Sequence, residues 1–258
     1  MVAPCSRHIA RLAGAGATAL GDLIFLPGCL RCGSFQLRRR AGVCLACWTA
    51  VRPGPRPSGP CLECAGSGQP CPHPAPPWSW ATAALSYEKA ARDLVRLYKF
   101  GPEGGRLPLA RPLAGLLAAA LRADGSALDV DLVIPVPSHR SRRCQRGFDA
   151  AASLARHVAT PAGLRPPRHL LWRRGAQGPR ARSSQVAGSA ARDDYLLRRG
   201  APRNLLGRTV LLLDDVCTTG ATLRRCAGLL LDGGVAEVRV AVLAFTPRRG
   251  FAGARAMD

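Results

Sequence analysis

Short apolar runs alternate with amphipathic segments from about Trp78 onward. Three runs have the length of buried strands: 130–136 (VDLVIPV), 209–213 (TVLLL) and 236–244 (AEVRVAVLA). Between them, apolar residues recur at helical spacing in 146–159 (RGFDAAASLARHVA) and in TLRRCAGLLLDGG, which ends in a glycine pair. The order strand, helix, strand, helix, strand predicts an α/β fold with a mostly parallel sheet and flanking helices. We assign residues 78–258 to this domain.

The first 77 residues differ in character and predict a separate small module. They hold eight of the eleven cysteines. Two C-x-x-C knuckles, Cys29 with Cys32 and Cys44 with Cys47, lie eleven residues apart, a spacing that closes a tetrahedral zinc site. A pair of disulfides is the alternative, but no secretory signal indicates an oxidising compartment. The sequence therefore predicts a structural zinc site.

A second cysteine cluster follows a connector rich in proline and glycine, 51–60 (VRPGPRPSGP). Cys61 and Cys64 form another knuckle, and Cys71 with His73 could complete a set of four ligands. The tight, proline-constrained spacing of Cys71 and His73 is atypical, so two interpretations stay open: a second zinc site, or reduced thiols on a loop. Either way we expect a structural role.

No stretch of the chain reaches the roughly 18 to 20 apolar residues that a membrane span needs, so we expect no transmembrane helix. Arg7 and Arg11 precede a weakly apolar run near the N-terminus, but glycines and Asp22 interrupt that run. We therefore expect a surface helix leading into a loop rather than a signal peptide, and a cytoplasmic protein.

Two acidic residues, Asp214 and Asp215, follow the predicted strand 209–213, and a hydroxyl-rich turn comes next. Ligands of parallel sheets bind at the carboxyl ends of strands, and the free amides of a following helix attract phosphate. The carboxylates would repel a phosphate in direct contact, so we expect them to accept hydrogen bonds from sugar hydroxyls or to hold Mg²⁺. As acids at a strand end, they should contribute little to the core. The pattern predicts a ribose 5-phosphate site.

The net charge of +21 and a pI near 11.2 favour an anionic partner, either nucleic acid or a phosphorylated small molecule, although biased composition is an alternative reason for the charge. Arginine supplies nearly all of it, since the only lysines are Lys89 and Lys99. Ten arginines between Arg165 and Arg203 predict a basic surface beside the phosphate turn. Trp172 and Tyr195 are candidate stacking platforms there for single-stranded DNA, although both could be core residues.

The segment VLLLDDVCTTGATL resembles the phosphoribosyl pyrophosphate (PRPP) motif of type I phosphoribosyltransferases. The chain also resembles the ComF family of competence-associated proteins in LGDLIFLPGCLRCG, SYEKAARDLVRLYKFG, DLVIPVPSHRSRRCQRGFDAA and SSQV. This resemblance implies a phosphoribosyltransferase fold, a zinc-binding N-terminal module, and a role in handling single-stranded DNA during natural transformation. It makes the DNA-uptake machinery a candidate partner.

By position, the resemblance implies that Asp214 and Asp215 face the ribose hydroxyls of PRPP, which binds with Mg²⁺. It implies that the 5-phosphate lies on the turn formed by Thr218, Thr219, Gly220, Ala221 and Thr222. The pyrophosphate would face the turn after strand 130–136, where Pro137, Ser138, Arg140 and Arg143 are the candidate residues.

The chain departs from the family pattern at three places. Asp149-Ala150 stands where the family usually has Asn-Gln, and 192–195 (RDDY) replaces the usual R-x-x-N. Thr218 occupies the position where purine-salvage relatives carry the acid that acts as a base, so no catalytic residue is evident. An active phosphoribosyltransferase with an unknown acceptor, a nucleic-acid-handling protein and a sensor of PRPP all remain hypotheses.

Overall fold

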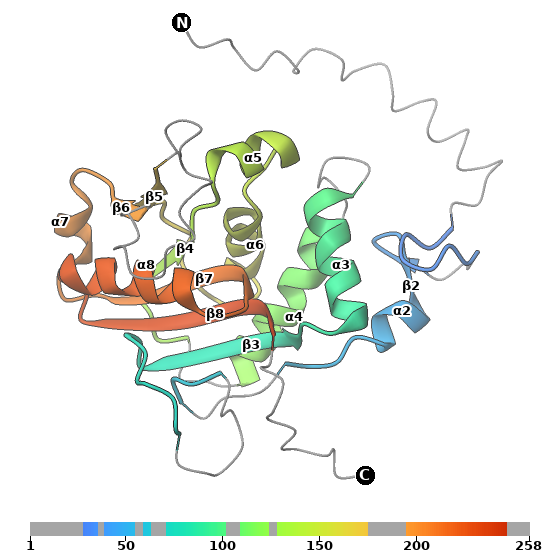
Figure 1. Cartoon of the computed structure of the whole chain (residues 1–258), viewed down its shortest axis with the longest axis horizontal. Coiled ribbons are helices and arrows are strands. Elements are labelled where there is room, and N and C mark those ends of the chain that lie inside the picture. Colours follow the sequence, from blue (N-terminus) through green and yellow to red (C-terminus); the bar gives the residue numbers. More distant parts are fainter. Residues whose placement is uncertain are drawn as a thin grey trace, which may run out of the picture.

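The computed structural model describes residues 28–35, 39–54, 59–62, 71–101, 109–123, 128–174 and 195–246. Its main sheet has four parallel strands in the order β3-β8-β7-β4 (Figure 1). Their bounds are β3 Trp80–Ser86, β8 Glu237–Phe245, β7 Thr209–Cys217 and β4 Leu132–Pro135. The predicted α/β fold with a parallel sheet is confirmed.

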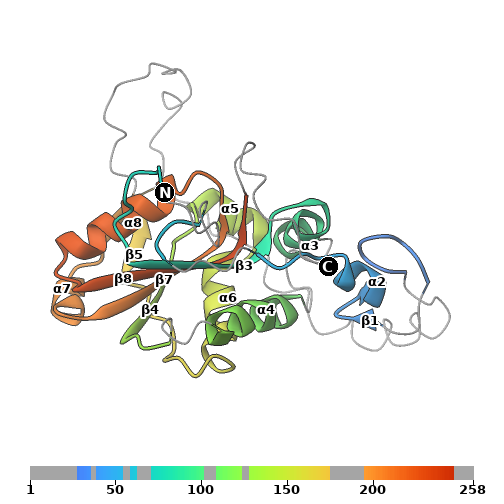
Figure 2. The ribbon, with the colours of Figure 1, turned by 90° about the horizontal axis from the view of Figure 1, so that it is seen from below.

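Helices cover both faces of this sheet, as a buried parallel sheet requires. Helix α8 (Ala221–Asp232) lies on one face, and α4 (Ala110–Ala123) and α6 (Ala150–Ala159) lie on the other (Figure 2). Successive side chains of β7 point to opposite faces of the sheet. Leu211 and Leu213 pack in the hydrophobic cluster with α4 and α6, whereas Val210 and Leu212 pack in the cluster with α8. The strand therefore reads as continuously apolar in the sequence.

Two element boundaries differ from the sequence prediction. β7 continues beyond Leu213 to Cys217, because Val216 and Cys217 still pair with β8. The helix predicted over 146–159 begins later, as α6 at Ala150, and a separate helix, α5 (Arg140–Arg146), ends at the first residue of that segment. Gly147 ends α5 in the left-handed conformation with φ of 77°, and the Asp149 side chain accepts a hydrogen bond from the Ala152 N–H at the start of α6.

A hairpin of β5 (Leu171–Arg173) and β6 (Tyr195–Leu197) lies beyond β4, followed by the short helix α7 (Ala201–Leu205). The chain leading into β5 bonds the outer edge of β4, where the Arg168 N–H donates to the Val133 carbonyl at 2.8 Å. Strands of three residues are too short to show an alternating pattern, so the sequence did not predict them.

The N-terminal cysteine module consists of the hairpin β1 (Arg39–Arg40) and β2 (Val43–Cys44) followed by α2 (Leu45–Thr49). It packs beside α3 (Lys89–Phe100), where Arg31 Nε lies 3.1 Å from Asp93 Oδ2 (Figure 1). The start of the predicted connector runs along β3, with the Gly54 N–H donating to the Ala84 carbonyl at 2.8 Å.

The domain boundary near residue 77 stays a prediction. The predicted N-terminal helix falls outside the described residues, which begin at Gly28. Within the described ranges, none of the helices combines the length and apolar character needed to cross a membrane.

Candidate functional site

The two acids of β7 lie in different environments. Because neighbouring side chains of a strand point to opposite faces, Asp215 faces the α3 side of the sheet and Asp214 faces the α8 side. Asp215 is 8% exposed and forms an ion pair with Lys99, whose Nζ lies 2.7 Å from Asp215 Oδ1. The expectation that both acids contribute little to the core is thus wrong for Asp215, since a buried ion pair is costly to break.

Lys99 is a site residue that sequence reasoning missed. It is the penultimate residue of α3 and lies 116 positions from Asp215 in the chain, so no local pattern connects the two. A compositional signal does exist: Lys99 is one of only two lysines in a chain that otherwise uses arginine. A lysine in such a chain indicates a position that suits a compact ammonium group.

Asp214 is partly buried and carries a perturbed carboxyl. Burial, together with repulsion from the Asp215 carboxylate, raises the pKa of Asp214 well above its ordinary value of 3.8. The Asp215 backbone N–H donates to Asp214 Oδ1 at 2.7 Å, which partly offsets this effect. A carboxyl that is destabilised as an anion in the free protein would gain from a cation or from sugar hydroxyls that hydrogen-bond to it.

The predicted phosphate turn is open. Thr218, Thr219 and Ala221 are exposed, Thr222 is half-buried, and α8 begins directly after Gly220. The first turn of α8 contains no acidic residue. Within the described residues, one side-chain acceptor lies at its start: Thr219 Oγ1, 3.4 Å from the Ala221 nitrogen. The amides of this helix start therefore remain available to an anion.

Gly220 stands at the turn between β7 and α8. A Cβ at this position would meet its nearest neighbours, Cys217 and Trp78, at an ordinary 3.9 Å. Its φ of 71° is the left-handed conformation that glycine adopts without strain. Gly220 is therefore required to turn the chain from β7 into α8.

The predicted pyrophosphate side lies at the end of β4, and Asp149 shapes it. The Ser138 backbone N–H donates to Asp149 Oδ2 at 3.0 Å, and the Ser138 hydroxyl lies 3.2 Å from Asp149 Oδ1. The same carboxylate caps α6. Asp149, a departure from the family pattern in the sequence, thus fixes the turn after β4 to the helix that follows.

A basic cavity of about 570 Å³ opens beside this turn. Pro137 and Arg143 line it, whereas Ser138 and Arg140 do not. The β5–β6 region contributes more basic side chains to the wall, namely His169, Arg173, Arg198 and Arg199. Among the described lining residues, Asp149 is the only acid, and it accepts hydrogen bonds from Ser138 and Ala152. The cavity is therefore suited to an anionic group.

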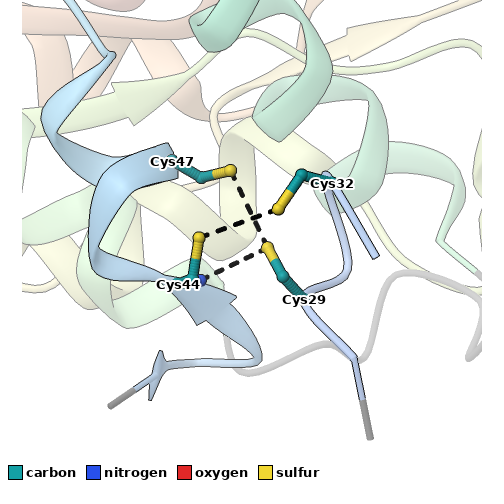
Figure 3. A group of neighbouring side chains, drawn as sticks. All are labelled: Cys29, Cys32, Cys44 and Cys47. Carbon is teal, nitrogen blue, oxygen red and sulfur yellow. Dashed lines mark hydrogen bonds between the residues drawn. The ribbon is translucent and has the colours of Figure 1, made fainter. Parts of the chain in front are cut away.

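The first cysteine cluster has the geometry of a tetrahedral metal site (Figure 3). The Sγ atoms of Cys29 and Cys47 are 3.8 Å apart, and those of Cys32 and Cys44 are also 3.8 Å apart. Tetrahedral zinc with Zn–S bonds of about 2.3 Å places two sulfur atoms about 3.8 Å apart, whereas a disulfide bond is about 2.05 Å long. The cluster is compatible with a structural zinc ion.

Nearby N–H groups support a thiolate at Cys29 of this cluster, whereas burial raises the pKa of Cys47 to about 12. The backbone N–H groups of Cys44 and Arg31 lie 3.3 and 3.4 Å from Cys29 Sγ. Burial raises the pKa of the Cys29 thiol, but these backbone donors and that of Cys32 outweigh it and lower the pKa to about 6. Arg31 also donates from Nη1 to Cys47 Sγ at 3.5 Å, so one side chain contacts both the cluster and Asp93 of α3.

The second cluster is partly described. Cys61, Cys71 and His73 bring their ligand atoms within 4.8 Å of one another, with His73 Nδ1 3.6 Å from Cys61 Sγ and 3.8 Å from Cys71 Sγ. Cys64, the fourth candidate, lies outside the described residues. Cys61 and His73 also line a cavity of about 440 Å³ that reaches the phosphate turn at Thr218 and Thr219.

A family model for the phosphoribosyl transferase domain matches residues 172–252, which include the phosphate turn. The DNA utilization protein YhgH of Shigella flexneri is 30% identical over 179 residues, covering 64% of this chain and 71% of that protein. The chain belongs to the ComF family. The DNA utilization protein YhgH of Salmonella typhimurium strain LT2 is 28% identical over 226 residues, which cover 84% of this ComF chain and 97% of that protein.

Solved structures resemble the ComF chain more distantly. Glutamine PRPP amidotransferase from B. subtilis, in complex with ADP and GMP, is 21% identical with a TM-score of 0.38, and the match covers 58% of this chain and 30% of that enzyme. Leishmania donovani UMP synthase is 16% identical with a TM-score of 0.31, covering 59% and 29%. At these TM-scores, the fold assignment rests on the strand order and the family model.

Proposed function

We propose that this ComF protein binds PRPP or a related ribose 5-phosphate, with Mg²⁺, at the end of β7, and that it handles single-stranded DNA in the cytoplasm. One observation carries the ligand proposal. The partly buried Asp214 lies near the end of β7, and the open start of α8, with its backbone amides, follows it after a short turn. The amides and Thr219 would hold the 5-phosphate, and Asp214 would face the ribose hydroxyls or the metal ion.

We infer different roles for the two acids from those that the sequence interpretation gave them. Lys99 already pairs with Asp215, so Asp214 is the carboxyl group left to bind a ligand, and a metal ion or sugar hydroxyls would favour its anion. Asp215 then acts by holding Lys99 and its helix α3 beside the site. An active phosphoribosyltransferase with an unknown acceptor is the second candidate function, and the arginine-lined cavity beside the β4 turn favours it, since pyrophosphate would leave there.

Isothermal titration with PRPP, with and without Mg²⁺, tests the ligand proposal. We expect Mg²⁺-dependent binding that Thr219→Val weakens about 10- to 100-fold, because a hydrogen bond to a charged phosphate contributes roughly 1.5 to 3 kcal/mol. Thr160→Val, at an exposed threonine after α6, is the matched control and should bind like the parent. Unchanged affinity in Thr219→Val would show that the phosphate lies elsewhere.

The two cysteine clusters complete the proposal. We infer that Cys29, Cys32, Cys44 and Cys47 hold a structural zinc ion, since their sulfur spacing matches it. The second cluster brings a Cys₂His set together, which favours a second ion over unconnected thiols. A stoichiometry near two metal ions per chain would support that interpretation, and a stoichiometry of one would leave the thiols of this cluster metal-free.

The DNA proposal is supported by the DNA utilization relatives and by the exposed groups of the β5–β6 region. Trp172 is 40% exposed and can stack on a base, whereas Tyr195 is only 6% exposed and packs under Arg173, whose guanidinium carbon lies 4.9 Å from the ring centroid. Arg174, the next residue, is exposed. Trp172 and Arg174 are thus the available contacts, and proteins of the DNA-uptake machinery are candidate partners.

We expect Trp172→Ala with Arg174→Ala to weaken binding of a single-stranded oligonucleotide by roughly 10-fold or more, since one stacked base contributes about 1 to 3 kcal/mol. Affinity should fall steeply with salt, and the parent should prefer single to double strands. Fluorescence anisotropy measures both, and Arg92→Ala on α3, also an exposed arginine, is the control. Equal, weak binding of both DNA forms would leave only nonspecific charge and favour the enzyme hypothesis.

A further inference from the structure

The cavity of about 440 Å³ at the phosphate turn differs from the basic cavity beside β4, and the two share no lining residue. Its described lining is mainly apolar and contains no aspartate or glutamate. Thr218, Thr219 and Gly220 of the turn line it, together with Trp78 and with Arg224 from the first turn of α8. Its volume lies within the range of roughly 300 to 1,000 Å³ that small-molecule sites occupy. The turn therefore adjoins a second ligand space.

Trp78 forms a fixed wall of this cavity next to the turn. Its Nε1 donates to the Pro60 carbonyl at 2.7 Å. Its Cη2 lies 3.9 Å from the position that a Cβ would occupy on Gly220. The guanidinium carbon of Arg224 lies 5.5 Å from the ring centroid. The ring is half-buried, so these contacts hold its position while part of its surface stays open to the cavity.

The neighbours of Trp78 indicate the chemistry of a ligand. Packing against the hydrophobic cluster of α8 would by itself give the ring only a structural role. Two groups beside it, however, attract phosphate: the open helix start after Gly220 and the exposed side chain of Arg224. A flat apolar surface next to a phosphate site suits a nucleotide, whose base stacks while its phosphate binds the amides.

We propose that this cavity binds a nucleobase, and that the base belongs to the nucleotide on the far side of the phosphate held by the turn. The inference rests on the proposed function for that phosphate and for the sugar near Asp214. In a DNA strand, the 5′-phosphate of one sugar is a diester that continues to the 3′ oxygen of the preceding nucleotide. The ligand is therefore the 3′ end of a single strand, with its last sugar near Asp214 and the preceding base on Trp78. Arg224 pairs with the phosphates of the strand.

The dinucleotide thymidylyl-(3′→5′)-thymidine tests this inference against an abasic analogue that keeps both sugars and the diester but lacks the first base. Calorimetry of the parent protein should show binding of the dinucleotide that is tighter by about 10-fold, the effect of one stacked base. Trp78→Leu should lose this preference. Both ligands place the same phosphate on the turn, so a general change of the turn cancels in the ratio of their affinities.

Trp48→Leu is the matched control. The Trp48 ring is also half-buried, and its Nε1 also donates to a backbone carbonyl, that of Arg40 at 3.0 Å. It lies in the N-terminal cysteine module and does not line the cavity. This variant should keep the preference for the dinucleotide. Loss of the preference in both variants to the same extent would show a general effect of losing a tryptophan and would overturn the inference.

A second measurement uses the parent protein alone, so it stands even if Trp78→Leu does not fold. The dinucleotide then carries 5-iodouracil as its first base, and ultraviolet light links this base to an aromatic side chain that it contacts. Mass spectrometry should find the link at Trp78. A link at Trp172 would place the base in the basic cavity and would overturn the inference.

Failure of this inference is distinguishable from failure of the proposed function. Equal affinity of the parent for the dinucleotide and its abasic analogue would overturn the inference. Ribose 5-phosphate binding that Thr219→Val weakens would in that case still support the proposed function. A parent protein that binds neither ribose 5-phosphate nor the dinucleotide would overturn both.

Discussion

Cys44→Ser is expected to release the metal ion and to unfold the N-terminal module. Elemental analysis of the parent protein should find at least one zinc per chain, and the variant should lose it. Structural zinc contributes on the order of 10 kcal/mol to the folding of zinc-finger peptides, and β1, β2 and α2 are too short to form a core of their own. Cys144→Ser, at an exposed cysteine of α5, should keep both metal and stability.

The effect of metal loss should extend beyond the module. Arg31 contacts Cys47 of the cluster through Nη1 and Asp93 of α3 through Nε, and α3 also carries Lys99. Hydrogen exchange of α3 should therefore quicken in Cys44→Ser, while α8, on the far face of the sheet, should keep its protection. A metal-free preparation with the thermal stability of the parent would refute the zinc prediction.

The fold was predictable where the sequence pattern is long and strongly periodic. β7, β8 and α8 have nine to twelve residues each, and the predicted elements lie at the observed positions. β3 was missed because alanines fill WATAALS, and alanine has low strand propensity; its pairing with β8 determines its structure. The local pattern also could not show that β7 continues through its acids, because pairing with β8 extends it.

The candidate site was predictable only in its local part. The order Asp214, Asp215, Thr218, Thr219, Gly220 lies in one segment, and the structure keeps it on one strand end and turn. Lys99 lies at this strand end through a contact with Asp215, 116 positions away in the chain, and Asp149 of the α6 start binds the turn after β4. Such contacts depend on how helices pack on the sheet, and a single sequence carries no direct record of that packing.

Separate replacement of the two acids of β7 should give opposite effects on stability. Asp215→Asn leaves Lys99 buried without its partner, so we expect a loss of about 3 to 5 kcal/mol in the free energy of unfolding. Asp214→Asn removes a carboxyl whose anion is disfavoured by burial and by Asp215, so the ligand-free variant should be more stable than the parent at neutral pH. Denaturant unfolding measures both changes, and the expected binding defect belongs to Asp214→Asn.

The pH dependence of the free energy of unfolding is a second test of the predicted stabilisation by Asp214→Asn. Since folding raises the pKa of Asp214, the folded parent holds its proton to higher pH than the unfolded chain does. This group therefore stabilises the fold fully below about pH 4, and the contribution is lost as pH rises through the raised pKa. The stability of Asp214→Asn relative to the parent should therefore increase as pH rises from about 4 through the raised pKa of Asp214, and then level off. If instead Asp214→Asn were the less stable variant at every pH while PRPP bound it as tightly as the parent, Asp214 would be a structural residue, and the ribose site would have to be placed elsewhere.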